Sequence, residues 1–177
     1  MKATYSIDPA HSNALFTVRH MMITNVRGGF RKVTGTIVYD PDNVPGSSVE
    51  ATIDAASINT GDEQRDAHLR SADFLDVEHY PNITFKGKKV EPKSPGELKV
   101  TGDLTIHGVT REVVLTAEGP TPEQKDPYGK VRIGLSAATK IKRSDHGLTW
   151  NAVLEAGGIA VGDELKIEID ISAIKQA

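Results

Sequence analysis

Residues 98–117, LKVTGDLTIHGVTREVVLTA, decide the fold because apolar and polar side chains alternate on both sides of His107-Gly108. From Leu98 to Ile106 every second residue is apolar or glycine. A period of two is typical of a strand that buries one face and exposes the other. A His-Gly pair between two such runs suits a tight turn. The stretch therefore predicts an antiparallel hairpin with one buried face.

The same alternation recurs along almost the whole chain. Further runs with a period of two occupy residues 4–8, 16–20, 33–39, 49–55, 83–85, 131–141 and 165–171. Together with the two strands of the hairpin, they predict eight or nine strands.

The helical signal is concentrated in one segment. Thr60–Ser71 is rich in helix formers, and Thr60 with Glu63 matches a capping box in which Thr60 is the N-cap. A shorter helical piece is expected over Asn151–Ala156, where Gly157 would end it. Since one substantial helix cannot cover a large sheet, we expect the sheet to close on itself.

We therefore predict an all-β fold, an extended eight-stranded antiparallel barrel in one domain of residues 1–177, with one short α-helix between strands. Such a barrel is either filled by its own side chains or holds one small ligand, as in lipocalins. Small residues lie on the expected inner faces, among them Gly35, Gly102 and Ala137, and the chain has only four Phe and one Trp, which favours a hollow barrel. Glycines also serve bends and bulges, so the alternation leaves both barrels open.

Composition and motifs narrow the function classes. A formal charge of −3 argues against a nucleic-acid partner. The chain has no cysteine, and its six histidines form no HxH or HxxxH pair, so we expect no metal and no cofactor. It also lacks a GxSxG elbow and a phosphate-binding glycine loop, so we do not expect an enzyme. Without an apolar leader or a run of about 18 apolar residues, we expect a cytoplasmic protein with no membrane span.

Eight segments, spread over nearly the whole chain, resemble the YceI-like family of lipocalin-fold, polyisoprenoid-binding proteins. They are DPAHS (8–12), FTVRH (16–20), VRGGF (26–30), SINT (57–60), RDAHLRSADF (65–74), YPNITF (80–85), GDLTIHGVT (102–110) and RSDHGL (143–148). The order and spacing of the segments carry the resemblance. The chain departs from the family pattern at His146, where an aromatic residue is usual, and at Tyr5, where Trp is common.

This resemblance implies a barrel with an internal apolar pocket for an isoprenoid lipid of the polyprenyl phosphate or prenylated quinone type. The role would be transport, storage or sensing. A fatty acid or fatty-acid amide is an alternative ligand, and a filled barrel that docks a protein partner is an alternative function. Burying each five-carbon isoprene unit contributes roughly 3 to 4 kcal/mol before ordering costs.

Two groups of residues are candidates for the binding site. Those expected to line the lipid tail are Phe16, Val18, Val33, Ile37, Ile53, Phe74, Phe85, Leu104, Ile106, Leu115, Ile133, Leu135 and Trp150. Those expected to meet the head group are His20, Arg27, Arg65, His68 and His146. Arg65 and His68 lie three residues apart, so they share a helix face and could bind a phosphate or quinone oxygen together. Alternatively, they anchor the helix to the barrel.

Three further features concern the surface. Met21–Phe30 is apolar for a connection and contains two glycines, so it is a candidate lid or a structured corner. The basic clusters Lys86–Lys89 and Lys140–Arg143 are expected to be solvated strand faces that could also bring the barrel into transient contact with an anionic membrane. Pairing of two barrels into a homodimer, through an open edge or their lids, is compatible with the pattern.

Overall fold

The computed structural model describes residues 1–152, 154 and 160–177. Half of the helical piece expected over Asn151–Ala156, residues 153, 155 and 156, lies outside the described residues, and Asn151, Ala152 and Leu154 are not helical. The strands are β1 (Ala3–Ile7), β2 (Asn13–His20), β3 (Thr24–Phe30), β4 (Val33–Tyr39), β5 (Ser48–Asp54), β6 (Asn82–Ser94), β7 (Glu97–Ile106), β8 (Val109–Glu118), β9 (Gln124–Lys125), β10 (Val131–Lys142) and β11 (Val161–Lys175). The helix α1 spans Glu63–Arg70, and the 3-10 turns are η1 (Pro9–His11), η2 (Val44–Gly46), η3 (Ala55–Ser57) and η4 (Arg143–His146).

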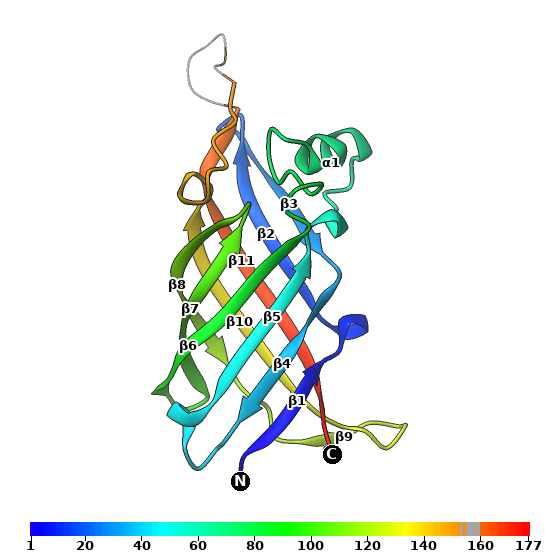
Figure 1. The fold of residues 1–177 in the computed structure, drawn as a ribbon, viewed down its shortest axis with the longest axis vertical. Coiled ribbons are helices and arrows are strands. Elements are labelled where there is room, and N and C mark those ends of the chain that lie inside the picture. The colour runs from blue at the N-terminus through cyan, green and yellow to red at the C-terminus, as the bar shows by residue number, and fades with distance from the viewer. Residues whose placement is uncertain (153, 155–159) are drawn as a thin grey trace.

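Eight of these strands close into an antiparallel barrel. Around the ring the order is β1, β4, β5, β6, β7, β8, β10 and β11, and β11 pairs with β1 to complete it. Both chain termini lie at one end of the barrel, and α1 lies at the other (Figure 1). This confirms the all-β, eight-stranded antiparallel barrel with one α-helix.

The hairpin from which the fold was predicted is formed by β7 and β8, whose pairing runs from Glu97 with Glu118 to Ile106 with Val109. His107 and Gly108 both have positive φ, 55° and 70°. Two such residues in succession are what a two-residue hairpin turn requires. The turn therefore forms where the sequence placed it.

The β2–β3 hairpin extends the wall of the barrel. β2 pairs with β11 over Val161–Asp170, and β1 pairs with the same edge over Ala173–Lys175, so β1 and β2 lie end to end along β11. The lid candidate Met21–Phe30 is corrected here, because Thr24–Phe30 is the strand β3 and pairs with Ala14–His20 of β2. Gly28 does not act as a hinge: a Cβ there would lie 2.6 Å from Phe16 Cζ, so glycine allows the Phe16 ring to pack on the strand.

The helix begins two residues later than the capping box predicted. Asp62 is the N-cap, and its side chain accepts a hydrogen bond from the Arg65 backbone N–H. Thr60 instead donates its backbone N–H and its hydroxyl to the buried Asp66 carboxylate. Thr60 therefore fixes the helix to the preceding segment rather than capping it. The N-cap was predicted wrongly because Thr60 and Asp62 are both residue types that cap helices.

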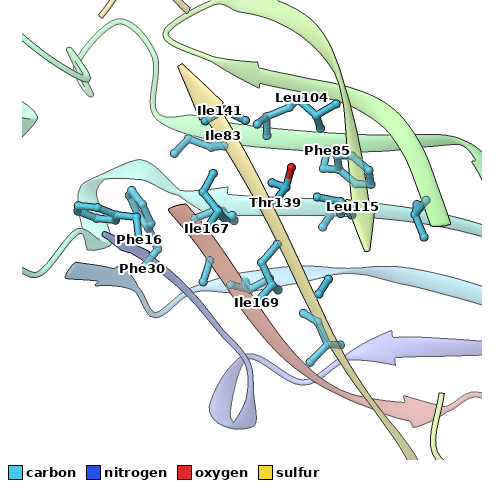
Figure 2. Close-up of a pocket in the computed structure, with 18 of the residues that line it drawn as sticks. Phe16, Phe30, Ile83, Phe85, Leu104, Leu115, Thr139, Ile141, Ile167 and Ile169 are labelled. Carbon is cyan, nitrogen blue, oxygen red and sulfur yellow. The ribbon is translucent and has the colours of Figure 1, made fainter. Parts of the chain in front are cut away.

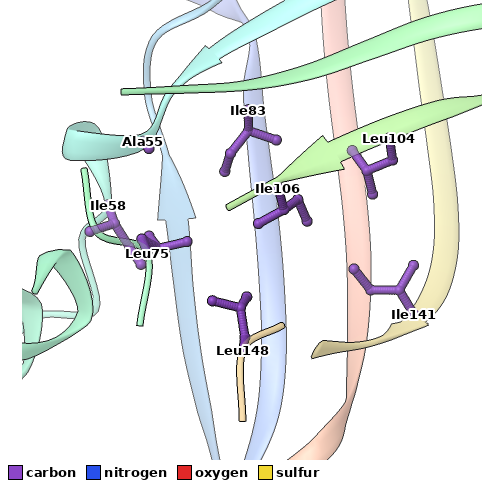
Figure 3. Packing of buried hydrophobic residues seen from close by; sticks show 8 residues of the cluster. All are labelled: Ala55, Ile58, Leu75, Ile83, Leu104, Ile106, Ile141 and Leu148. Atoms are coloured by element: carbon purple, nitrogen blue, oxygen red, sulfur yellow. The ribbon is translucent and has the colours of Figure 1, made fainter. Parts of the chain in front are cut away.

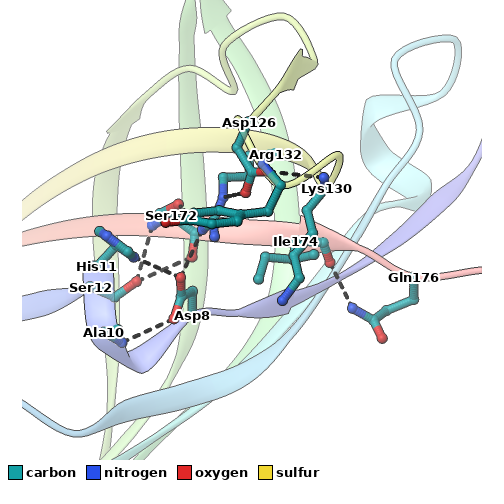
Figure 4. Close-up of polar contacts among 11 residues, drawn as sticks. Asp8, Ala10, His11, Ser12, Asp126, Lys130, Arg132, Ser172, Ile174 and Gln176 are labelled. Atoms are coloured by element: carbon teal, nitrogen blue, oxygen red, sulfur yellow. Dashed lines mark hydrogen bonds and ion pairs between the residues drawn. The ribbon is translucent and has the colours of Figure 1, made fainter.

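Charged side chains form a cluster on the side of the barrel where β1 ends (Figure 4). The Arg132 guanidinium lies 2.7 Å from Asp8 Oδ2 and 2.7 Å from Asp126 Oδ2. His11 Nδ1 is also 2.8 Å from Asp8 Oδ2. These hydrogen bonds lower the pKa of the Asp8 carboxyl from 3.8 to about 2. The cluster ties β10 to the turn that follows β1 and to the loop before β10.

We expect Asp8 to make folding acid-sensitive. Because its pKa is lower in the folded chain, its contribution is fully present above about pH 4 and is lost as the pH falls through about 2. The shift corresponds to about 2 kcal/mol at neutral pH. Denaturant unfolding of Asp8→Asn should show lower stability than the native chain at pH 7 and a gap that closes towards pH 2. A gap that stays constant over this range would contradict the assignment.

Candidate functional site

An elongated cavity of about 260 Å³ runs inside the barrel (Figure 2). Its lining extends from Ser47 and Pro120 near the terminal end to Leu69 and Leu148 near the helix end. Among the described residues that line it, only apolar atoms face the interior. The barrel is therefore hollow along most of its length, with a surface suited to a hydrocarbon chain.

Two glycines predicted on inner faces have separate physical reasons. A Cβ on Gly102 would lie 2.5 Å from Phe85 Cζ, so this glycine lets the ring lie against the barrel wall. A Cβ on Gly35 would lie 2.0 Å from the Glu50 carbonyl oxygen, and its φ is 150°. Gly35 therefore permits close approach of two strands. At both positions glycine is required because a Cβ atom would clash with a neighbouring strand, not because the strand bends there.

The structure places most of the predicted tail residues on the cavity wall. The lining includes Phe16, Val18, Val33, Ile37, Ile53, Phe74, Phe85, Leu104, Ile106, Leu115 and Leu135. Ile133 and Trp150 are not part of the lining. Ile133 is buried in a cluster with Tyr5 and Ile7, and the Trp150 ring packs on His68 and Phe74, with centroids 4.7 and 5.2 Å away.

The helix end of the cavity is closed by a cluster of buried side chains (Figure 3). Leu148 enters this cluster from the loop after η4, and Ile58 and Leu75 enter it from the segments before and after α1. Strand residues, including Leu104 and Ile141, complete it. A ligand that enters from this end therefore passes these side chains.

His146 does not face the cavity, contrary to its prediction as a head-group residue. Its side chain is 1% exposed, and Nδ1 donates to the Val109 carbonyl at 2.9 Å. His146 is buried because of how β8 and β10 pair. The two strands pair at three positions around Ala137 and then diverge. His146 fills the space between the diverging strands and satisfies a carbonyl that strand pairing leaves free.

Arg65 and His68 lie on α1 but have separate partners. The Arg65 guanidinium donates to the Thr60 hydroxyl and carbonyl at 2.7 and 2.8 Å, so Arg65 anchors the helix. His68 Nε2 lies 2.9 Å from Asp73 Oδ2. The His68 ring makes an edge contact with Phe74, a cavity residue, at 5.1 Å. The His68 ring therefore touches a side chain of the cavity wall.

The other two candidates lie on the β2–β3 hairpin. His20 is half-buried beside the hairpin turn and pairs with Val161. Arg27 is exposed and lines a separate groove of about 930 Å³ on the outside of the barrel, together with Lys166 and Glu168. Neither lines the apolar cavity.

Arg143 is a cavity residue that the sequence reading assigned to a solvated basic cluster. It is 5% exposed, and its guanidinium donates to the carbonyls of Leu148, Trp150, Val161 and Gly162 at 2.7 to 3.2 Å. Burial lowers its pKa, and the nearby Asp163 opposes that shift. Arg143 thus holds the loop that carries Leu148 against the start of β11. The signal was present in the sequence, because Arg143 continues the inward alternation of Thr139 and Ile141.

Over residues 1–152, 154 and 160–177, no group of three or more His, Asp or Glu side chains is arranged to hold a metal ion. Within the same described part of the chain, no helix is long and apolar enough to cross a membrane.

Comparison with known proteins agrees with this architecture. A UPF0312 protein of Vibrio cholerae is 40% identical over 148 residues, which cover 82% of this chain and 78% of that protein. The solved structure of the Campylobacter jejuni YceI protein is 35% identical, with a TM-score of 0.73 over 90% of each chain. A polyisoprenoid-binding domain from Saccharophagus degradans has a TM-score of 0.72 over 98% of this chain and 99% of that one, and at 17% identity it shares the fold alone. The YceI-like domain model matches residues 5–173, and the chain therefore belongs to the YceI-like family.

Proposed function

We propose that this protein binds a long-chain isoprenoid lipid, of the polyprenyl phosphate or prenylated quinone type, with its tail in the barrel. The observation that carries the proposal is the elongated cavity whose interior surface is apolar throughout its described lining. At about 0.8 kcal/mol per buried CH₂ group, two isoprene units contribute roughly 6 to 8 kcal/mol before ordering costs, and each further unit adds to this. The Saccharophagus degradans domain, described as polyisoprenoid-binding, supports the choice of ligand class.

The cavity also limits the ligand's shape and the position of its head. A volume of about 260 Å³ is slightly below the range of roughly 300 to 1,000 Å³ that is usual for ligand sites, so one slender chain fits better than a bulky ring system. Since apolar atoms alone face the interior along the described lining, a polar head group belongs at an end of the cavity. His68, beside Phe74, is the proposed contact for it at the helix end.

Binding can be tested in two steps. Protein purified from its source is extracted with organic solvent, and mass spectrometry should find a stoichiometric isoprenoid. The delipidated protein is then titrated with geranylgeraniol, palmitic acid and palmitamide. Trp150, the single tryptophan, contacts Phe74 on the cavity wall, so its fluorescence should report filling.

We expect geranylgeraniol to bind more tightly than the two straight-chain lipids. Tighter binding of palmitic acid or palmitamide would favour the fatty-acid alternative. If no lipid is recovered and none of the three is taken up, a lipid-binding role is refuted and a protein-interaction module is favoured. The proposal assigns the barrel binding without catalysis, and recovery of a chemically altered lipid after incubation would contradict that part.

A further inference from the structure

The tip of the β2–β3 hairpin exposes three consecutive large apolar side chains. Met21, Met22 and Ile23 are 41%, 60% and 68% exposed. Scattered single apolar residues are common on protein surfaces, but a contiguous group at the end of a projecting hairpin marks an interaction site. The tip lies at the helix end of the barrel (Figure 1).

Local backbone geometry argues against methionine at this turn. Met21 and Met22 have φ values of 51° and 61°, and the Ile23 N–H donates to the His20 carbonyl at 3.0 Å. Two successive residues with positive φ favour Asn-Gly, and bulky side chains are unfavourable there. The tip thus carries apolar bulk where turn chemistry prefers small polar residues. Such a departure from local preference is expected where a function requires it.

The hairpin also differs in charge from the rest of the chain. Between Pro9 and Tyr39 there is no Asp or Glu, whereas Arg19 and Arg27 lie on the hairpin and Arg31 and Lys32 directly follow it. Of these four positive charges, Lys32 lies 3.7 Å from the Asp54 carboxylate. The chain as a whole has a formal charge of −3. Arg19, next to the tip, donates to the uncharged oxygens of Asn25 and Met22. An apolar tip on a cationic hairpin is complementary to an anionic bilayer, whose headgroups attract the arginines and whose acyl region accepts the tip.

The position of the tip links it to the cavity. Val18, three residues before Met21, lines the cavity, and so does Val161, which pairs with His20. The Met21 N–H donates to the Ala160 carbonyl at 2.7 Å, beside the loop end that Arg143 fixes. A membrane that receives the tip therefore lies against the end of the barrel that Leu148 closes.

We propose that Met21, Met22 and Ile23, with Arg19 beside them and Arg27 farther along β3, dock the barrel on an anionic membrane surface so that lipid passes between the bilayer and the helix end of the cavity. The second part of this inference rests on the proposed function. The docking itself can be measured without it.

The test is sedimentation with vesicles of an equimolar mixture of phosphatidylcholine and phosphatidylglycerol. We expect the native chain to bind these vesicles, and to bind pure phosphatidylcholine vesicles more weakly. The double substitution Met21→Asn with Met22→Gly should weaken binding about tenfold or more, because it removes two side chains that would otherwise be buried in the acyl region. The substitution also suits the turn, so the melting temperature should be unchanged or raised.

Tyr128→Ser is the matched control. Tyr128 is 87% exposed but lies in the loop before β10, at the terminal end of the barrel (Figure 1). Its removal should leave vesicle binding unchanged. Docking is refuted if the native chain does not bind anionic vesicles, or if the tip variant binds them with the same affinity as the native chain. If the native chain does not bind vesicles but forms a concentration-dependent dimer, and the tip variant does not dimerise, membrane docking is refuted and the tip binds a second copy of the chain.

A separate measurement distinguishes docking from lipid binding. Geranylgeraniol delivered from cyclodextrin should enter the native chain and the tip variant equally, because no vesicle is involved. Failure of both to take it up would overturn the proposed function while leaving the vesicle result standing. If both proposals hold, the two proteins should take up geranylgeraniol equally from cyclodextrin, and the tip variant should take it up more slowly from anionic vesicles.

Discussion

Replacing Ala137 with phenylalanine is expected to weaken lipid binding by about a hundredfold or more. Ala137 lies on β10, and its methyl group lines the cavity opposite the lumen-facing side chains of the other strands. A phenyl ring at this position would occupy space that the tail needs, in an interior of about 260 Å³. Displacing three or four methylene-sized groups from the cavity would lose about 2 to 3 kcal/mol, and blocking the passage would lose more. Titration with geranylgeraniol, followed by Trp150 fluorescence, measures the change.

The adjacent residue supplies a control with identical chemistry. Ala138 lies on the same strand but faces solvent, where it pairs with Thr116 and Glu168. Ala138→Phe should bind lipid as the native chain does. Leu135→Trp, a second cavity substitution, should weaken binding in the same direction as Ala137→Phe. If both cavity variants stay folded by circular dichroism and bind normally, the interior is not the binding site.

The contrast between these neighbours also explains why the barrel could be predicted from sequence. In a strand, adjacent side chains face opposite sides, so the period of two assigned inner and outer faces without knowledge of the fold. For this reason Phe85 and Leu104, far apart in the sequence, were both expected on the cavity wall, where the structure places them. The number of apolar faces and the scarcity of helix then favoured closure of the sheet.

The site at the end of the barrel was harder to predict because loops build it. His146 is positioned by the divergence of β8 from β10, which depends on the register of two strands and leaves no local trace in the sequence. Ile133 follows the inward alternation of β10 but is packed in a cluster with Tyr5 and Ala173 and is not part of the cavity lining. Periodicity gives the face of a residue, whereas its height along the barrel decides whether it meets ligand, core or solvent.

Arg143 was assigned to solvent for a related reason. In the run Lys140–Arg143 the charges suggest a solvated face, yet alternation sends Lys140 and Lys142 outwards and Arg143 inwards. A buried arginine is tolerated there because loop carbonyls accept its N–H groups. The charge of the cluster predicted that Arg143 is exposed, whereas the alternation predicted that it is buried, and the alternation was correct.

Arg143→Met is expected to destabilise the protein and to speed ligand release. Methionine retains much of the apolar side chain but removes every donor, so the carbonyls of Leu148 and Trp150 lose their charged partner. Leaving such buried acceptors unpaired should cost about 2 to 4 kcal/mol, which lowers the melting temperature of a chain of this length by about 5 to 15 °C. Because the same bonds hold Leu148 over the cavity, bound geranylgeraniol should dissociate faster. Calorimetry and stopped-flow fluorescence measure the two effects.

Lys142→Met distinguishes the role of Arg143 from a general loss of positive charge. Lys142 is the preceding residue, it is exposed, and it pairs with Glu164 on the outer face of β11. Its substitution should change stability by less than about 0.5 kcal/mol. Equal stability of the two variants would show that the carbonyl contacts of Arg143 contribute little. A large loss of stability in Arg143→Met with unchanged ligand release would instead mean that the Leu148 loop does not control the exit, and that lipid leaves the barrel at its terminal end.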